Sequence, residues 1–181
     1  MGLDITSLSR ILTKESNPID FEFRELLEET VETFYINPEF YDQCSNYTIE
    51  GQNTIEYIRM EESMEIEFKA GSYRGYNEWR RQLCEFANDG LDIADLWDNF
   101  DKYKDAPFAS MLNFSDCEGA LDYLACEGLL KDFIDNKDVI TEKVKAHTRM
   151  GEMDKDHWIE IYDSFTQAMS CASNEGVMIF H

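Results

Sequence analysis

Apolar and charged residues alternate strictly over residues 64–70 (Met-Glu-Ile-Glu-Phe-Lys-Ala). This alternation is typical of a strand that buries one face. Residues 55–58 are apolar enough to form a neighbouring strand, so the two segments together predict an antiparallel pair. Short apolar runs at residues 3–6 and 177–181 predict two further strands.

A helix is predicted to begin at Asn17 and to end before Pro38. Asn17 can cap the helix, Pro18 suits its first position, and Asp20 lies in the positively polarised first turn. Beyond that turn, apolar residues fall on one arc of a 3.6-residue period and glutamates fall on the other. The arc expected to be buried consists of Phe23, Leu26, Leu27, Val31 and Phe34.

Helical periodicity recurs in the rest of the chain. A helix that contains Trp79, Leu83 and Phe86 on one face follows the alternating strand. Further helices are predicted over residues 121–134 and 156–172, the latter with Trp158, Ile161, Phe165 and Met169 facing inward. Strands and helices in these positions predict an α+β fold, with a small antiparallel sheet packed against several helices in a single domain, residues 1–181.

The chain is strongly acidic. It carries 38 Asp and Glu residues against 16 Lys and Arg residues, a formal net charge of −22. A surface of this sign repels phosphate backbones and anionic lipids, which bind through clusters of Lys and Arg. The charge therefore argues against binding to bare nucleic acid or to membranes and favours basic proteins as partners.

Cysteine usage and hydropathy narrow the class of protein further. The five cysteines are widely spaced and include no C-x-x-C pair, so neither a disulfide framework nor a zinc site is indicated. No run of apolar residues is long enough for a membrane span, and the first residues lack the pattern of a signal peptide. We therefore expect a cytoplasmic protein without a metal ion or other cofactor.

The acidic residues are concentrated in one part of the sequence. Between Glu15 and Glu67 there are 15 acidic residues and only two basic ones, Arg24 and Arg59, so this segment has a net charge of −13. On a helix, glutamates three or four residues apart are separated by about 5 Å along the axis, comparable with the phosphate spacing of one DNA strand. The predicted partner-binding residues are Glu22, Glu25, Glu28, Glu29, Glu32, Glu61, Glu62, Glu65 and Glu67.

Four short motifs carry a resemblance to a known group of proteins. They are MGLDI at residues 1–5, GSYRGYNEWR at 71–80, NFSDCEG at 113–119 and GVMIFH at 176–181. In these motifs the chain resembles a family of uncharacterised phage and bacterial proteins. The resemblance implies a shared fold and a mobile-element setting, and it implies no particular activity. Arg74 departs from the family pattern, in which that position is small.

An alternative interpretation places a pocket at these motifs. The glycine-bearing loop before the helix at residue 73 could hold an anion, and the 113–119 segment concentrates a serine, a cysteine and two carboxylates. The same segment could instead cap the following helix, and a divalent cation on Asp116, Glu118 and His181 is a further alternative. The predicted pocket residues are Asp4, Tyr73, Arg80, Ser115, Asp116, Glu118 and His181.

Two functions follow from these patterns. The leading hypothesis is a non-enzymatic binding protein, encoded by a phage or mobile element, that docks an acidic face onto the basic surface of a nucleic-acid-processing defence protein of the host. Inhibitors of the anti-CRISPR or anti-restriction type are the class it suggests. The alternative is an enzyme or small-ligand-binding protein that uses the motif pocket, and no catalytic residue is assigned for it.

The charge yields a first testable prediction. The purified protein should not shift duplex DNA or single-stranded RNA in a gel at physiological salt, because it carries a charge of −22 and has no basic stripe. Binding at micromolar concentration would contradict this prediction and would direct attention to Arg74, Arg80 and Arg81.

Overall fold

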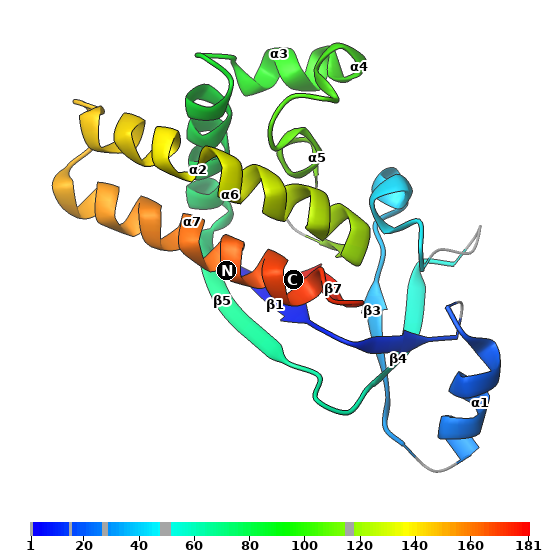
Figure 1. Ribbon diagram of the computed structural model, residues 1–181. Helices are drawn as coiled ribbons and strands as arrows, with labels where there is room; N and C mark the ends of the chain where they lie inside the picture. The colour runs from blue at the N-terminus through cyan, green and yellow to red at the C-terminus, as the bar shows by residue number, and fades with distance from the viewer. Residues whose placement is uncertain (1, 15, 27–28, 48–51, 115–117) are drawn as a thin grey trace.

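The computed structural model describes residues 2–14, 16–26, 29–47, 52–114 and 118–181. Figure 1 traces the elements from β1 to β7. In chain order they are β1 (Gly2–Leu8), β2 (Ile11–Thr13), α1 (Pro18–Leu26), β3 (Val31–Tyr35), the 3-10 helix η1 (Pro38–Cys44), β4 (Thr54–Arg59), β5 (Glu65–Ser72), α2 (Tyr73–Ala87), α3 (Ile93–Asp98), α4 (Phe100–Tyr103), α5 (Ala109–Leu112), β6 (Gly119–Asp122), α6 (Tyr123–Ala146), α7 (Glu152–Ala172) and β7 (Val177–Phe180).

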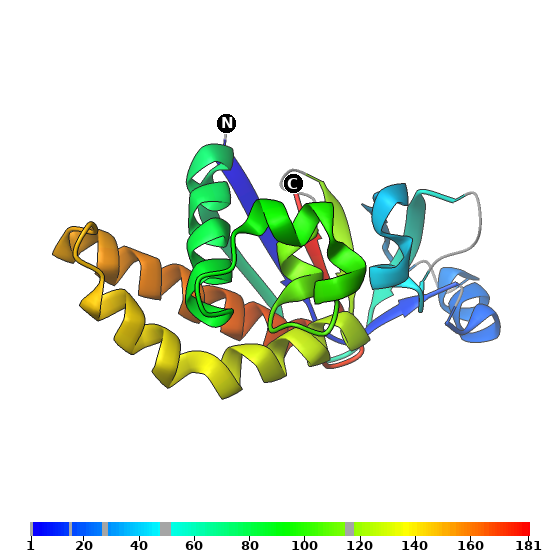
Figure 2. The ribbon, with the colours of Figure 1, turned by 90° about the horizontal axis from the view of Figure 1, so that it is seen from above.

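Two antiparallel sheets organise the molecule, and the α+β class is confirmed. The larger sheet has the strand order β5-β1-β7-β6, and the smaller has the order β2-β4-β3. Helices α2, α6 and α7 lie over one face of the larger sheet, while the smaller sheet and α1 lie at the opposite end of the molecule from the α6–α7 turn (Figures 1 and 2).

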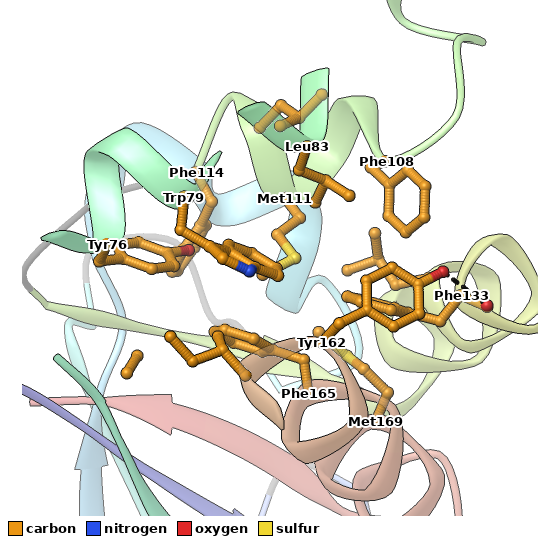
Figure 3. Packing of buried hydrophobic residues seen from close by; sticks show 14 of the residues in the cluster. Tyr76, Trp79, Leu83, Phe108, Met111, Phe114, Phe133, Tyr162, Phe165 and Met169 are labelled. Atoms are coloured by element: carbon orange, nitrogen blue, oxygen red, sulfur yellow. Dashed lines mark hydrogen bonds between the residues drawn. The ribbon is translucent and has the colours of Figure 1, made fainter. Parts of the chain in front are cut away.

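The main core lies between the larger sheet and its helices, and it is rich in aromatic rings (Figure 3). The ring of Trp79 on α2 stacks on that of Phe165 on α7 with centroids 5.1 Å apart. The hydroxyl of Tyr162, also buried, donates a 2.7 Å hydrogen bond to the carbonyl of Phe133. The inward face predicted for the last helix is confirmed, since Trp158, Ile161, Phe165 and Met169 are all buried.

A second core fills the space between the two sheets. It contains Leu8, Phe34, Ile55, Val177 and Ile179. Strand β7 therefore contributes to both cores: its alternate residues Met178 and Phe180 face the helices. All four residues of β7 are buried, so this strand is covered on both faces.

Capping groups fix where the helices begin. The side chain of Ser72 accepts from the N–H of Gly75 at the start of α2, and that of Asp122 accepts from the N–H of Ala125 at the start of α6. Buried Asp122 also accepts from the backbone N–H and the side-chain amide of Asn46, which joins the segment after η1 to α6. These side chains satisfy N–H groups that have no partner within the helix.

The helix predicted to begin at Asn17 and to end before Pro38 is wrong in its length and its buried face. The start is correct, because α1 begins at Pro18 and Asn17 accepts from the N–H of Asp20. The helix ends at Leu26, however, and residues 31–35 form β3, which pairs with β4. Phe21, on the other side of α1, is the residue that is buried, in a small cluster with Leu12 and Ile58.

The predicted pairing of residues 55–58 with residues 64–70 is also wrong. Both segments are strands, but β4 pairs with β2 and β3 while β5 pairs with β1. The difference follows from what each strand buries. Ile55 and Tyr57 of β4 contact the core between the sheets, whereas Phe68 of β5 packs edge-on against Phe165 of α7.

Gly176 generates a prediction about stability. A Cβ atom there would lie 1.9 Å from the carbonyl oxygen of Leu8, the residue that pairs with Val177. Gly176→Ala should therefore force β1 and β7 apart and lower the free energy of unfolding by at least about 2 kcal/mol. Urea denaturation monitored by tryptophan fluorescence measures this.

The matched control is Gly128→Ala in α6, where an added Cβ meets nothing within 4 Å. Because alanine favours a helix interior over glycine, this variant should be more stable by about 1 kcal/mol. Equal stability of the two variants would show that the close approach at Gly176 is not a constraint.

Candidate functional site

The acid-rich segment of the sequence folds as one end of the molecule. Residues 15–67 include α1, β3, η1 and β4, and their strands build the smaller sheet with β2. Figure 2 shows these elements together at the end remote from the α6–α7 turn. Much of the acid-rich segment is thus gathered in space, although Glu65 and Glu67 are on β5 of the larger sheet and Glu15, Glu28 and Glu50 lie outside the described residues. We call α1, η1, the smaller sheet and the turn between β4 and β5 the acidic end.

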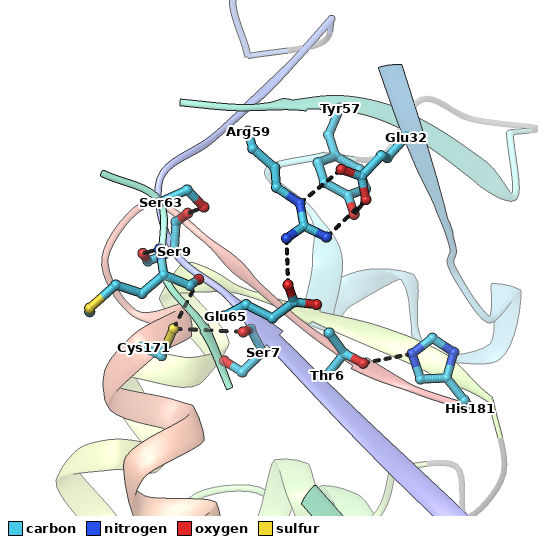
Figure 4. Close-up of polar contacts among 11 residues, drawn as sticks. Thr6, Ser7, Ser9, Glu32, Tyr57, Arg59, Ser63, Glu65, Cys171 and His181 are labelled. Atoms are coloured by element: carbon cyan, nitrogen blue, oxygen red, sulfur yellow. Dashed lines mark hydrogen bonds and ion pairs between the residues drawn. The ribbon is translucent and has the colours of Figure 1, made fainter. Parts of the chain in front are cut away.

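One arginine holds two of the acidic residues in this region (Figure 4). The guanidinium of Arg59 on β4 lies 2.8 Å from a carboxylate oxygen of Glu32 on β3 and 2.5 Å from one of Glu65 on β5. The hydroxyl of Tyr57 donates to Glu32 over 2.8 Å. The hydrogen bond from Arg59 lowers the pKa of Glu32, and burial, together with the bond to Glu32, raises the pKa of Tyr57.

The predicted partner-binding glutamates divide into two groups. Glu29 pairs with Arg24 and Glu62 pairs with Arg10, and Glu32 and Glu65 share Arg59. Glu28 lies outside the described residues. The glutamates that are exposed and have no ion pair with any described residue are Glu22, Glu25, Glu61 and Glu67. A single helical row from Glu22 to Glu32 does not exist, since Glu32 is on a strand.

The four motifs of the resemblance meet at one end of the larger sheet. Gly2 at the start of β1 lies opposite Ser72 at the end of β5, and Gly119 at the start of β6 lies opposite Phe180 at the end of β7. The backbone segments are therefore neighbours. Their polar side chains, however, point to different faces of the sheet.

Arg80 lies on the helix-covered face and is 4% exposed. Its guanidinium donates to the carbonyl of Phe114 and, over 2.6 Å, to the side chain of Asn77. It also lies 5.4 Å from the ring centroids of both Tyr76 and Trp97. A buried cation with these contacts ties α2 to the segment after α5.

Asp4 and His181 lie on the opposite face, in a groove of about 590 Å³ with Thr6, Glu67 and Lys69. The backbone N–H of His181 donates to the carbonyl of Asp4 over 3.0 Å, and its imidazole Nε2 is 3.1 Å from the hydroxyl of Thr6 (Figure 4).

The remaining predicted pocket residues do not join these groups. Tyr73 is half-buried at the start of α2, Glu118 is exposed before β6, and Ser115 and Asp116 lie outside the described residues. Arg80 does not share a pocket with Asp4 and His181, because it is buried on α2, which covers one face of the larger sheet, whereas Asp4 and His181 line the groove on the other face. In the described part of the chain, no group of three or more His, Cys, Asp or Glu residues is placed to hold a metal ion.

A groove that the motifs alone did not reveal lies between α2 and the first half of α7. It has a volume of about 640 Å³, and Trp79, Trp158 and Ile161 line it together with the cations Arg81 and Arg149. Two histidines, His147 and His157, and three acidic residues, Glu78, Glu85 and Asp154, also line it. Arg81 forms ion pairs with Glu78 and Glu85. The signal in the sequence was partial: GSYRGYNEWR supplies one wall, and nothing in residues 147–161 marks the other.

The cysteines are placed as packing residues. Cys44, Cys84, Cys126 and Cys171 are buried free thiols. Burial raises the pKa of each one, that of Cys84 to about 11. These four groups are therefore protonated at neutral pH and are poor nucleophiles. Cys117 lies outside the described residues.

Comparisons with protein-family models, with curated proteins and with solved structures find no match to this chain. The resemblance carried by the four motifs thus stays a prediction. Among the helices that the structure describes, none combines the length and the apolar composition that a membrane span requires.

Glu32 generates a prediction about pH. Because its pKa is lower in the folded protein than in the unfolded chain, its stabilising effect is present above the unfolded pKa and disappears as the pH falls through the folded pKa. Glu32→Gln should therefore lower the free energy of unfolding at pH 7, and the difference from the wild type should shrink as the pH falls below the ordinary pKa range of a glutamate. Urea titrations at several pH values measure it.

Glu61→Gln is the control. It removes the same charge as Glu32→Gln, but Glu61 has no ion pair with a described residue. Its effect at pH 7 should be much smaller. A difference between Glu32→Gln and the wild type that stays constant from pH 7 to pH 3 would contradict the role given to Arg59.

Proposed function

We propose that this protein is a non-enzymatic binding protein that docks its acidic end onto the basic nucleic-acid-binding surface of a nucleic-acid-processing protein. The observation that supports this most directly is the overlap of charge and structure: most of the segment with a net charge of −13 forms α1, η1 and two strands of the smaller sheet. A cytoplasmic location, a phage or mobile-element origin and inhibition of a host defence system of the anti-CRISPR or anti-restriction type belong to the same proposal.

The magnitude of the charge limits the mode of binding. The accessible surface of 9974 Å² is shared by 22 net charges, or roughly 450 Å² for each. B-DNA presents one charge for every ~100 Å² of its surface. The protein as a whole is therefore no mimic of a duplex, and only the acidic end imitates a short stretch of backbone.

Binding of this kind blocks access of the nucleic acid to the partner. The partner's lysines and arginines, which would hold phosphates, instead meet Glu22, Glu25, Glu61 and Glu67. Complementary charge accelerates association and makes it sensitive to salt. Glu29, Glu32, Glu62 and Glu65 contribute less, because each already faces an arginine of its own chain.

A second candidate function is small-molecule binding in the groove between α2 and α7. A volume of about 640 Å³ with buried aromatic rings and a few polar groups on its walls is typical of ligand sites. The indole N–H of Trp158 is buried there and has no hydrogen-bond partner in the described part of the chain, and the same holds for Nδ1 of His147. Arg149 is exposed at the rim.

Charge reversal tests the leading proposal. Changing Glu22, Glu25, Glu61 and Glu67 to Lys should abolish binding to the basic partner, because each attractive contact becomes a repulsive one. The fold should persist, since all four side chains are exposed. Affinity is measured by calorimetry or by release of labelled DNA from the partner at ~0.1 M salt.

The control changes Asp98, Asp101, Glu127 and Asp138 to Lys. These residues are exposed on α3, α4 and α6, and the two variants have the same net charge. The control should bind like the wild type, apart from a modest slowing of association. If both variants bind equally, the acidic end is not the docking site. Loss of partner binding in Arg149→Ala would then favour the groove between α2 and α7 as the functional site.

A further inference from the structure

Helix α1 presents large apolar side chains to solvent. Ile19 is 80% exposed, Phe23 is 61% exposed and Leu26 is 81% exposed. Scattered single apolar residues are common on protein surfaces, but three on one short helix form a contiguous patch. Nothing in the described chain covers it.

The spacing of these residues places them on one face. At roughly 100° per residue, Ile19, Phe23 and Leu26 fall within about 60° of one another around the helix axis. Phe21, which is buried against Leu12 and Ile58, projects from the opposite side. The i, i+4, i+7 pattern is the one by which helices insert into grooves of partner proteins.

The helix that carries this face is held in place. Asn17 accepts from the N–H of Asp20 and donates its amide to the carboxylate of the same residue over 2.7 Å. Phe21 anchors the other side of α1, and Arg24 pairs with Glu29. The apolar face is thus presented on a capped and anchored element.

Acidic residues border the patch on both sides. Asp20 and Glu22 lie about 100° and about 60° from Ile19 in opposite directions around the helix. With Glu25 also exposed, the rim is anionic while the centre is apolar. This arrangement complements an apolar groove whose edges carry Lys and Arg.

The charge around the apolar face of α1 decides which kind of partner covers it. A second copy of this chain would bring two acidic rims together, which is repulsive. A membrane-binding helix needs Lys and Arg on its polar face, and α1 has only Arg24, which is paired. We propose that Ile19, Phe23 and Leu26 are the apolar anchor of the acidic end and insert into a basic-rimmed apolar groove on the nucleic-acid-binding partner. This inference rests on the proposed function.

Site-specific photo-cross-linking identifies the molecule that covers the apolar face of α1. Phe23 is replaced by p-benzoylphenylalanine, and the same residue replaces Ile134 on α6, which is 60% exposed, as the control. After irradiation in lysate of the host cell, the cross-linked peptides are identified by mass spectrometry. The expected result is a cross-link from position 23 to apolar residues flanked by Lys or Arg in a nucleic-acid-binding protein, prevented by added duplex DNA and absent from position 134.

Other products of this experiment overturn the proposal. One is a cross-link between two copies of this chain, accompanied by dimers in sedimentation equilibrium. Another is a cross-link to lipid, accompanied by binding to phosphatidylglycerol vesicles. The proposal also fails if position 23 gives no cross-link while the same cross-linking residue placed at Glu67 does.

The purified captured protein then separates this inference from the function on which it rests. Phe23→Ser should weaken binding at least about tenfold at both ~0.1 M and ~0.5 M salt, because burial of apolar surface does not depend on screening. Ile134→Ser should change it less than about twofold. The variant in which Glu22, Glu25, Glu61 and Glu67 are changed to Lys, here called the four-lysine variant, should bind weakly at low salt and approach the wild type at high salt.

Two outcomes are distinct failures. If Phe23→Ser binds normally and the four-lysine variant does not, the proposed function stands and the apolar anchor is refuted. If neither variant affects binding, both proposals are refuted. Circular dichroism and thermal midpoints confirm that each variant is folded.

Discussion

Strand β7 is the element on which the two halves of the structure depend. Its alternate residues enter different cores: Met178 and Phe180 meet the helical layer, while Val177 and Ile179 meet the smaller sheet. It also pairs with β1 on one side and with β6 on the other. A strand so enclosed tolerates little displacement, and Gly176 allows its closest approach to β1. The glycine of the GVMIFH motif therefore has a structural reason that is independent of any function.

The acidic end combines two opposing demands. Concentrated negative charge provides a surface for a basic partner, but like charges repel within the fold. Arg59 reconciles them, because it joins β4 to Glu32 on β3 and to Glu65 on β5 while other glutamates stay exposed. In the proposed mode of binding, the apolar face of α1 adds what charge alone does not provide, namely affinity that survives salt. The electrostatic and the apolar contributions to the proposed binding thus come from separate residues, and they differ in how they respond to salt.

Local signals predicted much of the fold. Alternation at residues 64–70 gave the long strand β5, the Asn17–Pro18 pair gave the start of α1, and the face of α7 was correct. What failed depended on tertiary placement. Nothing local shows that Leu12 and Ile58 select Phe21 over Phe23 for burial, or that β4 and β5 belong to different sheets. The site was predicted only in part for the same reason. The backbone segments of the motifs are neighbours, but the motifs do not show which face of the sheet the helices cover, and this places Arg80 and Asp4 on opposite faces.

The order of the strands along the chain has a consequence for synthesis. Phe180 follows its partner Ile5 by 175 positions, yet β7 lies between β1 and β6. During translation, β1 and β5 can pair early, but the larger sheet and both cores stay incomplete until β7 leaves the ribosome. Contacts of such sequence separation form slowly. The place of β7 between β1 and β6 therefore stays open, with apolar residues exposed, until β7 has been synthesised. The excess negative charge, already present by residue 67, keeps neighbouring chains apart during that interval.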